Sequence, residues 1–160
     1  MIKKNNIKKF CIVANCTWYL YNFRKEFLEE LYNRNYKLIL LCPKDKYYRY
    51  ISKYFVKAHN LNLIRGSENP FFEVFSILQL FFYYLKYKPD LIHHFTIKPA
   101  IYGSILARIV RVRNIINHIT GLGPSFYNHR LKIKLVNKIL EPIYKFGFRS
   151  IRTFFIGIRK

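Results

Sequence analysis

The sequence is short of acidic residues and of cysteine, and each shortage excludes a kind of chemistry. Only 8 aspartates and glutamates stand against 29 lysines and arginines in 160 residues. The chain offers no pair of carboxylates for glycoside hydrolysis, no Ser-His-Asp order and no metal-ligand cluster. The 3 cysteines have no Cys-x-x-Cys spacing, and Cys11 and Cys42 lie in apolar runs, as small buried residues do. We therefore expect no metal, no cofactor and a reduced, cytoplasmic setting.

Glycine is missing from the whole stretch between Ile2 and Arg65. A dinucleotide-binding Rossmann fold has a Gly-x-Gly-x-x-Gly turn after its first strand, where the backbone must approach a pyrophosphate closely. Here the first predicted strand is followed by Asn15, Cys16, Thr17 and Trp18. This excludes NAD, FAD and P-loop chemistry in this half of the chain. The indole ring of Trp18, the side-chain amides of Asn15 and Asn22 and the guanidinium group of Arg24 suit a sugar or a lipid phosphate. The alternative is that Trp18 only caps the edge of the sheet.

Long apolar runs without charge are also missing. The longest apolar stretch lies between Pro70 and Pro89 and carries Glu73 and Gln79, whereas a membrane span needs about 20 mostly apolar residues. The N-terminal apolar run is too short for a signal peptide. We expect no membrane span, although the phenylalanines and tyrosines of residues 71–87 suit a helix at a bilayer surface.

Positive charge is what the sequence has in excess, with a formal net charge of +21. Such a balance attracts polyanions, either nucleic acid or anionic lipid. A/T-rich codons explain part of the lysine excess, but aspartate and glutamate have similar codons and are scarce. A basic nucleic-acid-binding module without enzymatic activity is therefore the alternative reading. Its weakness is that the basic residues are spread along the chain and form no known nucleic-acid-binding motif.

Apolar runs alternate with helical patterns along the chain, which predicts an α/β fold. Continuous apolar runs are typical of strands covered on both faces, as in parallel sheets. We predict a three-layer, Rossmann-like domain with a mostly parallel, doubly wound sheet of five to seven strands. We predict that this domain covers residues 1–127. Residues 128–160 would form a basic helical segment and a final strand, which belong either to the same domain or to a truncated interdomain region. The expected strands are 9–14, 37–42, 56–63, 91–95, 114–119 and 152–158, and the expected helices are 20–31 (stopped by a left-handed Asn35), 71–87, 99–110 and 130–148 (interrupted by Pro142).

Polar residues cluster where the predicted strands end, and in such sheets ligands bind at the carboxyl ends of the strands. The adjacent His93 and His94 point to opposite faces of a strand, so they cannot serve one metal as a simple pair. We expect one of them in the core and the other in a cleft. Thr96 and Lys98 open the next helix, where free N–H groups favour a phosphate or carboxylate.

Three stretches resemble a known family. KKFCIVANCTWYLYNFRKEFLEELYNRNYKLILLCP, KPDLIHHFTIKPAIYGSILAR and NIINHITGLG are similar, in order and spacing, to the N-terminal half of family-4-like bacterial glycosyltransferases, which act on cell-surface polysaccharides and lipid-linked oligosaccharides. The resemblance covers about residues 8–127. It implies one half of a GT-B architecture, in which two Rossmann-like domains face a cleft. The N-terminal domain receives the acceptor and the C-terminal domain binds a nucleotide-sugar donor.

The resemblance also implies roles for individual residues, in a retaining hexosyl- or N-acetylhexosaminyltransferase. The chain departs from many members of the family, because it has no glycine-rich loop after the first strand and no histidine at position 120. The donor half is absent, so we expect either a truncated gene or a donor half on a separate chain. The predicted catalytic residues are His93, His94 and Thr120, and the predicted acceptor-binding residues are Asn15, Trp18, Asn22, Arg24, Thr96, Lys98, Gly121 and Gly123. Of these, Trp18 and Lys98 are predicted from their own chemistry and not from the resemblance.

The charge and the aromatic helix together predict a location on the inner face of the cytoplasmic membrane, as a peripheral protein. There a lipid-linked acceptor and an anionic surface would both be partners. Residues 71–87 would supply aromatic contacts and residues 130–149 basic ones. In the first of these segments we expect residues 74, 77, 78 and 81 to pack on the sheet, leaving Phe72, Tyr83 and Tyr84 for lipid.

Overall fold

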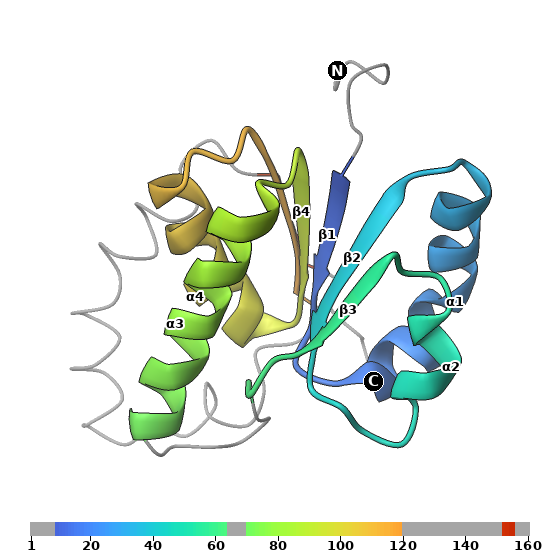
Figure 1. The fold of residues 1–160 in the computed structure, drawn as a ribbon, viewed down its shortest axis with the longest axis horizontal. Helices are drawn as coiled ribbons and strands as arrows, with labels where there is room; N and C mark the ends of the chain where they lie inside the picture. The colour runs from blue at the N-terminus through green and yellow to red at the C-terminus, as the bar shows by residue number, and fades with distance from the viewer. Residues whose placement is uncertain (1–8, 64–69, 120–151, 156–160) are drawn as a thin grey trace.

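A computed structural model describes residues 9–63, 70–119 and 152–155 (Figure 1). Six parallel strands form one sheet in the order β3-β2-β1-β4-β5-β6. The predicted Rossmann-like α/β fold with a parallel sheet is therefore confirmed. The strands are β1 (Lys9–Val13), β2 (Lys37–Cys42), β3 (Lys57–Asn60), β4 (Leu91–Phe95), β5 (Asn114–Ile119) and β6 (Arg152–Phe155).

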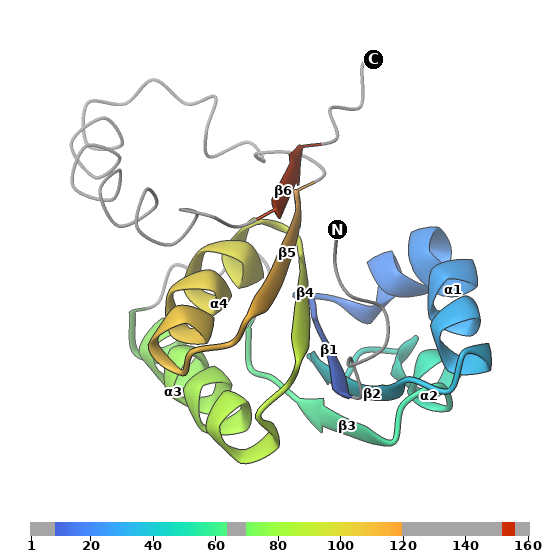
Figure 2. The same cartoon turned by 90° about the horizontal axis from the view of Figure 1, so that it is seen from above.

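Helices cover both faces of this sheet, as expected for a doubly wound domain. In Figure 2, α1 and α2 lie on one face, and α3 and α4 lie on the other. The short α2 was not predicted, because five residues are too few to display helical periodicity. The expected helix at 130–148 and the boundary between 127 and 128 lie outside the described residues. The described helices are α1 (Thr17–Asn33), α2 (Tyr48–Ser52), α3 (Pro70–Tyr87) and α4 (Ile97–Ile109).

The central strands β1, β2 and β4 contribute to two hydrophobic cores, one under each pair of helices. On β1, Phe10 and Ile12 face α1, whereas Cys11 and Val13 face α3 and α4. This double burial explains why the strands read as continuous apolar runs rather than alternating ones. Cys11 and Cys42 are buried, as predicted, and burial raises the pKa of both thiols.

The two ends of α1 show how the chain manages without glycine. Asn35 has a φ of 59° just after the helix, which confirms the predicted left-handed stop. At the other end, the Asp45 carboxylate from the loop after β2 accepts hydrogen bonds from the backbone N–H groups of Thr17 (2.8 Å) and Trp18 (3.3 Å). An internal anion thus occupies the helix N-terminus that would face a pyrophosphate in a dinucleotide-binding fold.

The orientation of α3 differs from the prediction. Val74 and Leu78 were expected to pack on the sheet, but they are exposed, and Tyr84, which was expected to be free for lipid, is buried. Both the inner and the outer face of α3 are apolar, so helical periodicity alone cannot decide which of them meets the sheet. Phe72 is exposed, as predicted. The outer stripe of α3 consists of Phe71, Val74, Phe75, Leu78, Phe82 and Leu85.

Candidate functional site

The strand order reverses between β1 and β4, which places a topological switch point at their carboxyl ends. The chain leaves β1 toward β2 and β3, and then returns through α3 to β4 on the other side of β1. Val13 pairs in register with His94, so Asn15 after β1 and Thr96 after β4 follow neighbouring strand ends. Open α/β sheets bind their ligands at such a point. We use "switch point" below for the carboxyl ends of β1 and β4.

Buried polar atoms without a hydrogen-bond partner gather near this switch point. Such atoms are rare in folded proteins, and each one asks for an explanation. In the described residues they come from the ends of β1 and β4, from β4 itself, and from the N-terminal halves of α1 and α3. This gathering of unused donors and acceptors marks a polar site. The atoms are Asn15 Oδ1, Tyr19 Oη, Arg24 Nε, Glu73 Oε2, His93 Nδ1 and Nε2, and Thr96 Oγ1.

Arg24 is a half-buried cation without a carboxylate in ion-pair contact among the described residues. Its Nη2 lies 2.7 Å from Nε2 of His118, and its guanidinium lies over the rings of Tyr19 and Phe95. Because an arginine only donates, His118 must accept at Nε2 and is neutral. Burial, and then the charge of Arg24, lower the pKa of His118 accordingly. Arg24 therefore offers an uncompensated positive charge.

His93 lies beside this cation on the α1 face of β4. The residue is 7% exposed, and its ring stacks on Phe95 with the centroids 4.1 Å apart. Neither ring nitrogen has a partner. Burial first, and then the neighbouring His118, His94 and Arg24, lower the pKa of His93 to about 3. Such an imidazole is neutral near pH 7 and too weak a base to remove a proton readily, so its geometry suits hydrogen bonding to a ligand.

His94 points to the opposite face, as predicted, but the expected cleft is not there, because α3 and α4 cover it. Its Nδ1 donates to Oδ1 of Asn117 and its Nε2 accepts from the Tyr84 hydroxyl, both at 2.7 Å. Asn117 in turn donates to Ser104 Oγ at 2.8 Å. Both histidines are therefore buried, and His94 has no nitrogen left for a ligand. This geometry speaks against the predicted catalytic role of His94 and leaves His93 as the one near the site.

Trp18 and Asn22 lie away from the Arg24 cluster. Trp18 is exposed and meets Phe23 edge-on, with the centroids 5.5 Å apart. The Asn22 side chain donates to the Trp18 carbonyl at 2.8 Å, four residues back on the same helix. Residues 22 and 24 are about 200° apart on a helix. The structure therefore brings Asn15, Arg24, His93 and Thr96 to one region and leaves Asn22 at the surface.

Lys98 differs from its prediction because it has an acidic partner. Its Nζ lies 2.5 Å from Oε1 of Glu73, which belongs to the first turn of α3. Lys98 thus brings little free charge to a phosphate. Glu73 was missed by the sequence reasoning, although a lone acid at the start of a strongly apolar helix was a signal. Thr120, Gly121 and Gly123 lie outside the described residues, and their roles stay predictions.

The profile of the glycosyl transferase 4-like family matches residues 9–156. Among curated proteins, the N,N'-diacetylbacillosaminyl-diphospho-undecaprenol alpha-1,3-N-acetylgalactosaminyltransferase of Campylobacter jejuni is 24% identical over 139 residues. The match covers 84% of this chain and 36% of that protein, so the chain spans about a third of the length of this relative. Nothing in these comparisons supports the alternative of a nucleic-acid-binding module.

Solved structures resemble the chain in fold. MurG of Acinetobacter baumannii has a TM-score of 0.57 at 15% identity, over 96% of this chain and 46% of that one. The UDP-N-acetylglucosamine 2-epimerase of Rickettsia bellii has a TM-score of 0.55 at 14% identity, over 87% of this chain and 38% of that one. At such low identity the likeness concerns the fold alone. It confirms the prediction of one Rossmann-like half of a GT-B architecture.

Proposed function

The chain belongs to the glycosyl transferase 4-like family, and we propose that it is the acceptor-binding half of a glycosyltransferase. The reaction would move a sugar from a nucleotide-sugar donor to a lipid-linked or glycan acceptor, with the donor held by a further domain or a separate chain. The name of the Campylobacter relative, which includes a diphospho-undecaprenol, supports a lipid-linked acceptor. The observation that carries the proposal is the set of unpartnered polar atoms around Arg24 at the switch point.

Arg24 is the residue to which the proposal assigns the phosphate groups of the acceptor. A half-buried guanidinium without a carboxylate gains strongly from an anion, and its planar donors fit phosphate oxygens. Asn15, His93 and Thr96 have hydrogen-bonding atoms left for neighbouring oxygens of the same ligand. Lys98 has no part in holding the diphosphate, because its charge is paired with Glu73.

Binding of a soluble sugar diphosphate tests the role of Arg24. We expect Arg24→Gln to weaken binding about 10- to 100-fold in isothermal titration calorimetry, because a hydrogen-bonded charge contributes roughly 1.5–3 kcal/mol. Lys25→Gln is the matched control: it removes the same charge one position along the helix, where Lys25 is exposed beside Glu29. Equal affinities of the Arg24 variant and the wild type, with both folded by circular dichroism, would overturn the proposal.

A peripheral position on an anionic bilayer is the second part of the proposal. Among the described helices, none is both long and apolar enough to cross a membrane. The outer stripe of α3 instead presents large apolar side chains over its whole length, from Phe71, which is 83% exposed, to Leu85. An exposed apolar helix face of this kind suits the interface between headgroups and acyl chains.

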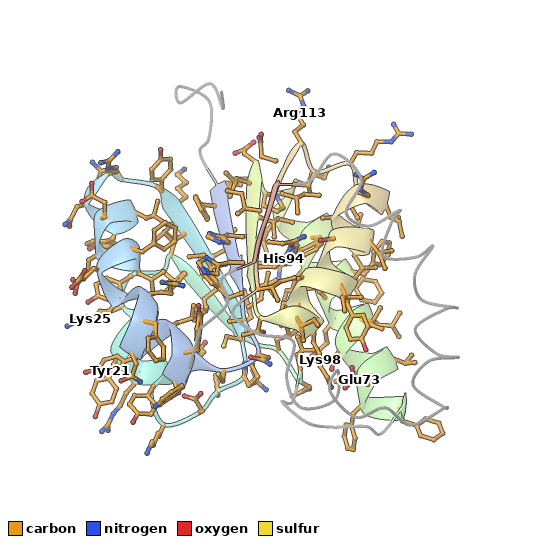
Figure 3. All side chains as sticks on the ribbon, turned by 180° about the vertical axis from the view of Figure 1, so that it is seen from behind. Tyr21, Lys25, Glu73, His94, Lys98 and Arg113 are labelled. Atoms are coloured by element: carbon orange, nitrogen blue, oxygen red, sulfur yellow. The ribbon has the colours of Figure 1, made fainter. Side chains whose placement is uncertain are left out.

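Charge at the end of the stripe favours an anionic bilayer over a neutral partner. The helices α3 and α4 end at the same edge of the sheet, where basic residues outnumber the acidic Asp90. Figure 3 shows one of them, Arg113, projecting from this edge. Each basic residue near an anionic leaflet contributes on the order of 1 kcal/mol. The predicted basic segment 130–149 lies outside the described residues. The basic residues of the edge are Lys86, Lys88, Arg108, Arg111 and Arg113.

Flotation with liposomes tests this location. We expect the wild type to float with vesicles containing about a third anionic lipid and Phe82→Glu to lose most of that recovery, because a charge at the centre of the stripe opposes insertion. Val56→Glu is the control, since Val56 is as exposed as Phe82 but lies before β3, away from the stripe. Equal flotation of Phe82→Glu and wild type would refute the assignment. A wild-type dimer that Phe82→Glu dissociates, seen by analytical ultracentrifugation without loss of flotation, would assign the stripe to a second copy instead.

A further inference from the structure

Glu73 and Lys98 form an ion pair at the same edge of the sheet as the switch point. Glu73 comes from the first turn of α3 and Lys98 from the first turn of α4, two residues after Thr96. Their side chains are 16% and 23% exposed, and Glu73 Oε1 lies 2.5 Å from the ammonium group. Figure 3 shows the two side chains meeting below His94.

Only half of the Glu73 carboxylate is satisfied. Oε1 contacts Lys98, whereas Oε2 is buried and has no hydrogen-bond partner. A carboxylate can accept about four hydrogen bonds, and an unused buried oxygen carries a desolvation cost. A pair that served packing alone would gain by turning both oxygens to donors. The free oxygen is therefore open to a further hydrogen-bond donor.

The chemistry of the pair differs from that of Arg24. Glu73 and Lys98 together carry no net charge, so they do not select an anion, and Oε2 can only accept a hydrogen bond. Arg24, by contrast, only donates, and no carboxylate in the described part of the chain forms an ion pair with it. A neutral ligand group with O–H or N–H donors suits the Glu73 oxygen, as the hydroxyl and acetamido groups of a sugar ring do.

Thr96 adds a second hydroxyl-binding group close to the pair. It has a φ of 74°, which is unfavourable for a β-branched residue, and its backbone N–H donates to the His118 carbonyl at 3.0 Å. Its Oγ1 is buried and unpartnered. Because Thr96 can both donate and accept, it complements the Glu73 oxygen toward neighbouring hydroxyls of one sugar.

We propose that Glu73 is a sugar-binding residue: its Oε2 accepts a hydrogen bond from a hydroxyl or acetamido group of the acceptor sugar, and Lys98 positions the carboxylate. This rests on the proposed function and adds a direction to it. The diphosphate of the acceptor lies at Arg24, and the sugar attached to it lies toward α3 and α4. The phosphate and sugar subsites thus stand on opposite sides of the switch point.

Two soluble probes separate the subsites in titrations of the 160-residue chain. Inorganic pyrophosphate reports on Arg24 alone, and a sugar diphosphate reports on both subsites. We expect Glu73→Gln to weaken the sugar diphosphate about 10-fold and to leave pyrophosphate unchanged. Arg24→Gln should weaken both probes. A Glu73 variant that weakens both probes equally, or neither, would overturn the assignment. If the wild type binds neither probe, the proposed function itself fails.

Lys98→Gln and deoxygenated sugars distinguish sugar binding from a structural role. If Glu73 served only to hold Lys98, Glu73→Gln would weaken a deoxy-sugar diphosphate as much as the parent compound. We expect one deoxy compound to bind wild type and Glu73→Gln equally, which identifies the hydroxyl that Oε2 accepts from. Lys98→Gln is expected to have a smaller effect than Glu73→Gln, because the carboxylate remains. Loss of binding that is independent of the sugar hydroxyls in every variant would contradict the proposal.

Discussion

Alanine at position 103 is expected to lower the free energy of unfolding by about 3 kcal/mol, the upper end of what overpacking a core costs. The sign is opposite to that of an ordinary helical site, where glycine is the less favourable residue by about 1 kcal/mol. A β-carbon on Gly103 would lie 2.2 Å from Nε2 of His94 and 2.9 Å from the Tyr84 hydroxyl. Gly103 is in α4 and lets this helix approach β4 closely enough for the polar network to form.

The His94 ring cannot move aside at little cost, because Tyr84 and Asn117 hold it from both ends and all three side chains are buried. Urea unfolding of the full chain measures the effect. The control is a double-mutant cycle with His94→Ala, which removes the ring that the new methyl group would meet. In that background we expect Gly103→Ala to cost less than about 1 kcal/mol. A Gly103→Ala protein as stable as the wild type would show that the contact relaxes freely.

The sheet could be predicted from the sequence because its signal is local. Runs such as Leu38–Cys42 are apolar at every position, and the predicted strand 37–42 has the same bounds as the observed one. The facing of α3 could not be predicted, since Leu78 on the outside is as apolar as Leu80 on the inside. Which stripe meets the sheet depends on how α3 packs against α4, and this packing is not encoded in the period of one helix.

The residues of the site could be predicted in part. The rule that ligands bind where strands end found Asn15, His93 and Thr96, and the family resemblance added Arg24. All four carry unpartnered buried atoms, and their roles toward an acceptor remain predictions. This rule could not predict side-chain contacts between segments that are distant in the sequence. The Glu73 partner of Lys98 lies 25 residues away, so its discovery required the packing of α3 beside α4. The network that occupies His94 required β5 in the same way.

Stability is expected to fall steeply below pH 6.5 because two histidines are buried in the neutral form. Burial lowers the pKa of His94 to about 4, although the hydrogen bond with Asn117 raises it in part. Burial also lowers the pKa of His93 to about 3. In the unfolded chain both pKa values are close to 6.5. As the pH falls from 6.5, the unfolded state binds protons first. The stability that is fully present above 6.5 is therefore lost progressively toward pH 4 and pH 3.

By pH 5 each histidine should have lost about 2 kcal/mol of stabilisation, since one pH unit in this range corresponds to about 1.4 kcal/mol. Urea unfolding at pH 7 and pH 5 measures the sum. His93→Phe isolates one contribution: the ring lies against Phe27 and Phe95 and has no hydrogen-bond partner to lose. We expect this variant to be at least as stable as wild type at pH 7 and to show about half the pH dependence. An unchanged slope in His93→Phe would mean that His93 is hydrated and titrates normally in the folded protein.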